Sequence, residues 1–109
     1  MTLTPGAVVA GHRVVRSFGL VHGNTIRARH VGRDILAAMK NIVGGEIEEY
    51  TKLMGEAREQ ALDRMAGHAT ARGANAVINV RFSTSYIMGS ASEILAYGEA
   101  VVLEQEARD

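Results

Sequence analysis

The sequence predicts a small two-layer α+β domain in which an antiparallel sheet packs against two helices. Alternating apolar and polar residues indicate strands near both ends of the chain, and apolar residues at helical spacing fill the middle. The predicted order is two strands, two helices and two strands, without an internal repeat or linker. Because 109 residues is the length of one domain, we expect a single domain over residues 1–109. Residues 1–7 are expected to form a loose lead-in and residues 104–109 a frayed tail.

The first half of the sheet is predicted as a hairpin. Residues 13–21 read as one strand and residues 25–29 as a second, shorter strand, with a turn at Gly23-Asn24 between them. Glycine and asparagine adopt the positive φ angles that hairpin turns need. Val8-Val9 is a candidate for a short additional strand.

Two helices are predicted next. Asp34 is placed as an N-cap or first-turn acid, and apolar residues then recur at helical spacing until Gly44-Gly45. The second helix is expected from about Ile47 to Arg72, with Gly73 as the residue that ends it. Its apolar stripe consists of Tyr50, Leu53, Met54, Ala57, Ala61, Met65 and Ala69.

Two strands close the chain. Strict alternation from Asn75 to Ile87 predicts that Ala76, Ile78, Val80, Phe82 and Tyr86 share one face, and that Asn79, Arg81, Ser83 and Ser85 share the other. The last strand is predicted over residues 93–103. Glycine inside a strand marks a bulge or a close backbone approach, which we expect at Gly19 and Gly98.

Composition excludes several classes of function. The chain has no cysteine, which excludes disulfides and thiolate sites, and its formal net charge is zero, which gives no reason to expect nucleic acid as a partner. No apolar run approaches the roughly 20 residues of a membrane span, and the N-terminus lacks the pattern of a secretory signal. We therefore expect a cytoplasmic protein without a membrane or nucleic-acid partner.

Several sequence blocks together resemble the YbjQ-like family, which is described as heavy-metal-binding. The blocks are Gly19-Leu20-Val21-x-Gly23, Arg33-Asp34-Ile35, Ile42-Val43-Gly44-Gly45, Tyr50, Ala57-Arg58, Gly73-Ala74-Asn75-Ala76-Val77 and Gly98-x-Ala100-Val101. The resemblance spans about residues 9–103. It implies a dodecin-like α+β subunit that assembles into a homo-oligomeric ring, usually a pentamer. One departure is Glu99, where the family commonly has threonine.

Metal binding has to be argued from histidine, because no thiolate is present. His12, His22 and His30 flank the predicted hairpin and are the candidate metal ligands, although their spacing matches no compact motif. The alternative is that these histidines are exposed or hydrogen-bonded without a metal. His68, near the end of the long helix, is interpreted as a histidine favoured by the helix dipole or placed at the edge of the core, in preference to a metal ligand.

These observations favour a homo-oligomeric protein that binds a divalent heavy metal or a small ligand at subunit interfaces. The alternative is an assembly protein without a ligand of its own. No Ser/His/Asp arrangement or other catalytic motif is present in the sequence, so an enzyme is not predicted.

Overall fold

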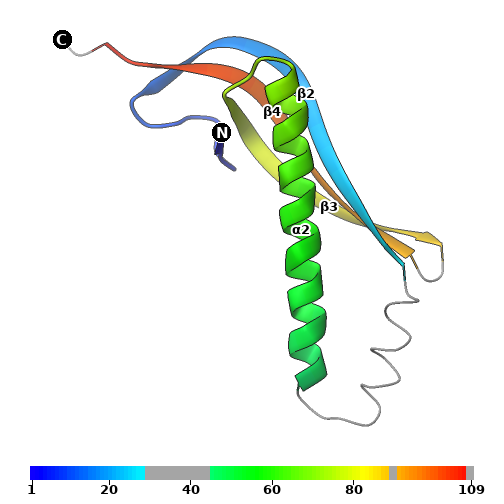
Figure 1. The fold of residues 1–109 in the computed structure, drawn as a ribbon. Coiled ribbons are helices and arrows are strands. Elements are labelled where there is room, and N and C mark those ends of the chain that lie inside the picture. Colours follow the sequence, from blue (N-terminus) through cyan, green and yellow to red (C-terminus); the bar gives the residue numbers. More distant parts are fainter. Residues whose placement is uncertain (29–44, 89–90, 108–109) are drawn as a thin grey trace.

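The computed structural model describes residues 1–28, 45–88 and 91–107 of the chain. It is an α+β structure in which one long helix lies across a four-stranded sheet (Figure 1). The elements are β1 (Thr2–Leu3), β2 (His12–Ala28), α2 (Gly45–Ala71), β3 (Ala76–Met88) and β4 (Ala91–Gln105). The long predicted helix is confirmed, and the helix predicted to begin at Asp34 lies outside the described residues.

The sheet is mixed, whereas an antiparallel sheet was predicted. Its order is β1-β3-β4-β2, with β4 antiparallel to both neighbours and β1 parallel to β3. The backbone of Thr4 bonds to Val77 and Val80 of β3. Residues 1–7 are therefore not a loose lead-in, because they satisfy backbone groups at the outer edge of β3. At the other terminus, Glu104 and Gln105 belong to β4, so the predicted frayed tail is also too long.

The predicted hairpin at Gly23-Asn24 is wrong, because β2 runs without a turn from His12 to Ala28. Gly23 is buried where α2 crosses β2. A Cβ atom there would overlap the backbone of Ala61 and Met65. The glycine therefore permits close helix–sheet contact, not a change of chain direction.

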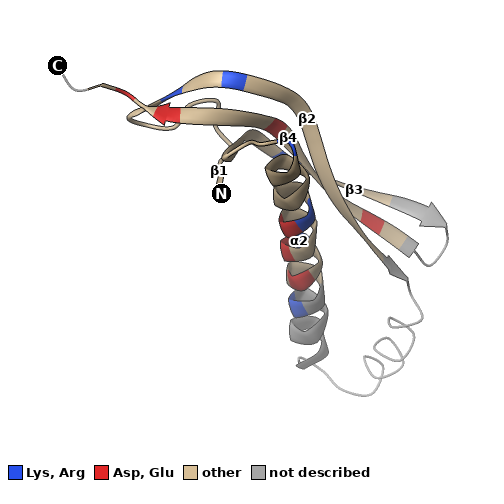
Figure 2. Ribbon diagram, turned by 45° about the horizontal axis from the view of Figure 1, so that its top comes forward, with Lys and Arg blue, Asp and Glu red and all other residues tan. Residues whose placement is uncertain are grey.

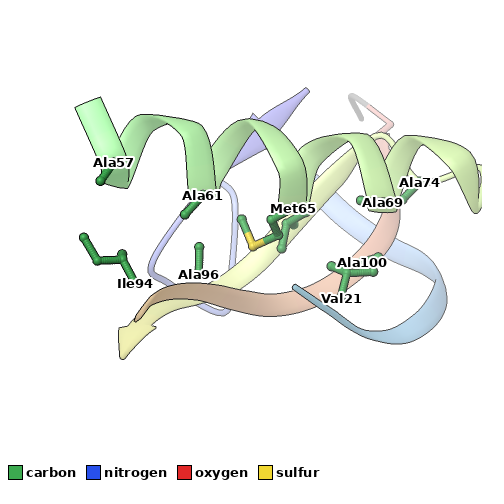
Figure 3. Close-up of a cluster of buried hydrophobic side chains, with 10 residues drawn as sticks. Val21, Ala57, Ala61, Met65, Ala69, Ala74, Ile94, Ala96 and Ala100 are labelled. Atoms are coloured by element: carbon green, nitrogen blue, oxygen red, sulfur yellow. The ribbon is translucent and has the colours of Figure 1, made fainter. Parts of the chain in front are cut away.

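Small side chains form most of the main core (Figure 3). Ala57, Ala61, Met65 and Ala69 are fully buried on one side of α2, as the helical stripe predicted. They face Val21 of β2 and a row of β4 residues, namely Ile94, Ala96 and Ala100. Because alanine lacks a long side chain, the helix lies close to the sheet. In so tightly packed a core, removal of even one methyl group lowers the stability of the fold.

The C-terminus of α2 is closed by a Schellman motif. Gly73 has a φ of 96°, its N–H bonds to the Thr70 carbonyl at 3.0 Å, and the Ala74 N–H bonds to the Ala69 carbonyl at 3.1 Å. Ala69 and Ala74 also share the core cluster. The predicted helix stop at Gly73 is confirmed.

The strict alternation predicted for β3 is interrupted by a bulge. Asn79 has a φ of 54°, and the register with β4 shifts between Ile78 and Arg81. As a result Val77 and Val80 pack against the helix-side core, while Ile78 joins a second cluster. The predicted grouping of Ile78 with Val80 and Phe82 is therefore wrong. The extra residue of the bulge moves the side chains that follow it to the opposite face of the sheet from the one that strict alternation predicts.

The expected roles of the two strand glycines are both found. Gly19 has a φ of 84° and lies at a register shift between β2 and β4. A Cβ atom at Gly98 would lie 2.7 Å from Val77 Cγ1 and 2.8 Å from the Ile78 carbonyl oxygen. Gly98 thus provides the space into which the β3 bulge fits.

Candidate functional site

Two histidines from distant parts of the sequence meet where α2 passes the outer edge of β2. The ring centroids of His22 and His68 are 5.4 Å apart, and the ring planes are nearly perpendicular at 88°. His68 is half-buried, while the His22 side chain is exposed. The structure therefore brings His22 to the histidine that sequence reasoning had set aside as a dipole-stabilised residue.

His68 belongs to a row of three basic side chains that we call the edge clasp: Arg64, His68 and Arg72. Arg64 and His68 lie on α2 and Arg72 directly follows its last residue, so their four-residue spacing places them on one side of the helix. Arg64 Nη1 donates to the Asn24 carbonyl at 2.6 Å, and Arg72 Nη1 donates to the Phe18 carbonyl at 3.2 Å. Between them, His68 Nδ1 lies 3.3 Å from the His22 carbonyl oxygen.

The edge clasp has a clear physical role. β2 is the last strand of the sheet, so among the described residues its outer backbone groups face no partner strand. Three of those carbonyls instead meet cations or an imidazole from the helix that crosses the sheet. The edge clasp thus provides hydrogen-bond partners for three carbonyls of this edge and fixes the position of the His68 ring.

The surroundings of His68 suit a metal ligand. When Nδ1 carries the proton it donates to the His22 carbonyl, and Nε2 is then left with a free lone pair. A metal-binding histidine usually has this arrangement, in which a backbone carbonyl fixes the tautomer through the other ring nitrogen. The other tautomer is also accommodated, because the His22 N–H lies 3.4 Å from the same Nδ1 atom.

The other two predicted ligands are not part of this pair. His12 is exposed at the start of β2, and its Nδ1 lies 3.0 Å from the Ala10 carbonyl oxygen. Ten residues of the same strand separate it from His22, which corresponds to about 30 Å. His30 lies outside the described residues. Sequence reasoning missed His68 as a ligand; the four-residue spacing of the edge clasp is a sequence signal that could have pointed to it.

The described residues of one chain bring two imidazoles together at this place. Within residues 1–28, 45–88 and 91–107, no group of three or more His, Asp or Glu side chains could hold a metal ion. Structural zinc sites have four ligands, so further ligands would have to come from outside these described residues, for example from water or a second copy of the chain.

Beside His22, the sheet face that α2 does not cover is hollowed into a trough of about 440 Å³. Six side chains from two neighbouring strands line it: Leu20, His22, Asn24, Glu93, Leu95 and Tyr97. They alternate along each strand with residues that face the helix. His22 pairs directly with Tyr97 and Asn24 with Leu95, so these side chains project from the same face.

Charge is unevenly distributed around the two histidines. β2 has no charged side chain from Ser17 to Ile26, whereas charged residues recur along the described part of α2 (Figure 2). The edge clasp therefore brings its positive charge to β2 from the helix. Among the described residues, no helix is both long enough and apolar enough to cross a membrane.

Comparisons with known proteins agree with the fold and the sequence blocks. A family profile described as "Putative heavy-metal-binding" matches residues 1–104. A UPF0145 protein of Dehalococcoides mccartyi is 57% identical over 104 residues, covering 95% of this chain and 100% of the relative. A UPF0145 protein of Pyrococcus abyssi is 55% identical over 100 residues, covering 92% of this chain and 88% of the relative.

A solved structure supports the same fold. The crystal structure of a DUF74-family protein of unknown function from Pediococcus pentosaceus superposes with a TM-score of 0.62 at 13% identity. The alignment covers 95% of this chain and 98% of that one, and at this identity it bears on the fold alone. The profile match and the relatives that are more than half identical show that the chain belongs to the YbjQ-like family of UPF0145 proteins.

Proposed function

We propose that this protein is a homo-oligomer that binds a divalent heavy metal through His22 and His68. The observation that supports the proposal is the contact between the two residues: their ring centroids are 5.4 Å apart, and His68 Nδ1 is held at the His22 carbonyl. The family description points to the same class of ligand.

The residues present fit a metal of borderline softness. Imidazole nitrogen binds zinc, copper and nickel, whereas calcium and magnesium prefer oxygen ligands. One tetrahedral ion with metal–nitrogen bonds of about 2.0–2.1 Å can join two imidazole rings at roughly the observed separation. His22 is exposed and can turn about its side-chain bonds, so it can present a nitrogen to an ion on His68 Nε2.

Self-association would complete the ligand set. The side chains of Leu20 and Ile26 flank His22 along β2 and are 66% and 56% exposed, which is high for large aliphatic residues. If a second copy covers these residues, His22 is brought into the interface, where the neighbouring chain would supply the remaining ligands. We propose that the assembly is the pentameric ring implied by the family resemblance, and that the protein works in the cytoplasm.

The decisive experiment is native mass spectrometry of the untagged protein before and after addition of zinc, copper or nickel. The expected result is an oligomer that takes up at most one metal per chain, with uptake lost in both His22→Ala and His68→Ala. His12→Ala is the matched control and should bind metal normally, because His12 lies at the far end of β2. His30→Ala tests the remaining predicted ligand.

Two outcomes would contradict the proposal. Unchanged uptake in His68→Ala would place any metal elsewhere on the chain. An oligomer that stays metal-free at micromolar metal concentrations would instead favour the alternative, an assembly protein without a ligand of its own.

A further inference from the structure

An apolar hollow lies at the edge of the sheet opposite β2, where β1 and β3 meet α2. Its volume is about 300 Å³. Six side chains line it, and we call them the edge pocket: Leu3, Thr4, Pro5, Leu62, Val80 and Phe82. Phe82 is 46% exposed and Leu3 is 37% exposed, which is high for large apolar side chains. Within the described part of the chain, the edge pocket is therefore an apolar surface that is not filled.

Hydrogen bonds fix the walls of the edge pocket. The Thr4 N–H donates to the Val77 carbonyl at 3.0 Å, and the Val80 N–H donates to the Thr4 carbonyl at 3.0 Å. Arg81 Nη1 donates to the Pro5 carbonyl at 2.7 Å. Val80 also packs against the main core. A hollow whose walls are already in place loses little conformational entropy when a side chain enters it.

We propose that the edge pocket of one chain receives the Leu20 side chain of the next chain. This inference rests on the proposed homo-oligomer, in which a second copy covers Leu20, and it names the surface that covers it. Leu20 is more exposed than Ile26 and lies two residues from His22, so the contact brings His22 to the neighbouring chain. β2 and the edge pocket lie at opposite edges of one sheet. Two different surfaces that join head to tail form a heterologous contact, which is the kind that closes a ring.

The distribution of charge favours this contact over one in which two copies meet through β2. β2 contains no Asp or Glu, and α2 contains none after Asp63, so the edge that carries the edge clasp is basic. Two copies that met β2 to β2 would bring two edge clasps together, and like charges oppose such a contact. Around the edge pocket the charges are mixed, because Glu59, Asp63 and Arg58 are all exposed on α2 within about one turn of Leu62. A β2 edge is therefore repelled less there than at a second β2 edge.

Complementation between two variants tests the contact. Leu20→Asp changes one surface and Phe82→Asp the other, and both side chains are exposed in the single chain. We expect each variant alone to assemble about tenfold more weakly than the parent protein or worse, because an unpaired carboxylate would be buried in the contact. An equimolar mixture should form a dimer with one chain of each kind, since one intact contact remains. Native mass spectrometry measures this composition directly, because the two variants differ in mass.

Val8→Asp is the matched control. It places the same charge at an aliphatic residue that is 77% exposed and lies outside both surfaces, so it should leave assembly unchanged. Circular dichroism checks the fold of each variant. Phe82→Ser, which removes the ring without adding a charge, replaces Phe82→Asp if that variant is unfolded.

Three outcomes would overturn this inference: Phe82→Asp assembles like the parent protein, the two variants do not combine, or Val8→Asp weakens assembly as much as they do. Each of these leaves the metal site and the homo-oligomer of the proposed function in place. A monomeric parent protein would instead contradict the homo-oligomer itself and this contact with it. An assembled parent protein that binds no metal would contradict the metal site alone.

Discussion

His68 Nδ1 lies 3.3 Å from the carbonyl oxygen and 3.4 Å from the backbone nitrogen of His22, 46 residues away in the sequence. One ring nitrogen thus meets both a donor and an acceptor of the same residue. Either neutral tautomer of His68 can be satisfied there, since Nδ1 donates in one and accepts in the other. The contact holds α2 against the sheet edge and leaves Nε2 of the donating tautomer for another partner.

The edge clasp is expected to limit pairing of β2 with other strands. Replacing Arg64 and Arg72 together by alanine removes donors to the Asn24 and Phe18 carbonyls and leaves this edge bare. We expect faster aggregation on mild heating, measured by light scattering. The control is Arg58→Ala with Lys52→Ala, which removes two exposed cations of α2 that are not part of the edge clasp. Equal aggregation of both double variants would argue against the clasp.

Gly23→Ala tests the close crossing of α2 over β2. The added methyl group would overlap backbone atoms of Ala61 and Met65, and backbone cannot yield as a flexible side chain can. We expect a loss of about 3 kcal/mol or more in unfolding free energy, measured by urea denaturation. A change below about 1 kcal/mol would mean that the helix moves away easily and that the tight crossing is unimportant.

Gly67→Ala is predicted to change stability in the opposite direction. Gly67 is an exposed residue in the middle of the C-terminal half of α2, and a Cβ atom there would meet no described atom within 4 Å beyond its chain neighbours and the nearby helix backbone. Alanine has a higher helix propensity than glycine, so the unfolding free energy should rise by about 0.5–1 kcal/mol. The same urea titration checks this, and a destabilised variant would indicate that a second chain covers this side of the helix.

The side chain of Asn75 forms two hydrogen bonds with the backbone of Leu103, as a neighbouring strand would. Its Oδ1 accepts from the Leu103 N–H at 2.7 Å, and its Nδ2 donates to the Leu103 carbonyl at 2.9 Å. Asn75→Ala removes both bonds and should lower the unfolding free energy by about 1–2 kcal/mol. Amide hydrogen exchange at Leu103 provides the residue-specific measurement, because that N–H would lose its acceptor. Unchanged exchange would mean that the bond is not maintained in solution.

The sequence alone determined the family, the α+β class and most element boundaries. Local patterns are sufficient for these features. The stripe from Ala57 to Ala69 and the glycine at position 73 specify a helix and its end through interactions between near neighbours. The ends of the two strands after it were also predicted to within a few residues, because alternating apolar and polar residues indicate a strand with one buried face.

The tertiary structure decided the points at which a local signal has two meanings. Gly23 is compatible with a turn or with a close crossing, and only the position of α2 distinguishes them. Likewise, alternation in β3 gave no warning of the bulge at Asn79, which depends on the space left by Gly98 on the neighbouring strand. The metal-site hypothesis changed for the same reason. His22 and His68 meet through the packing of a helix on a sheet edge, and sequence spacing carries no information about contacts between residues so far apart.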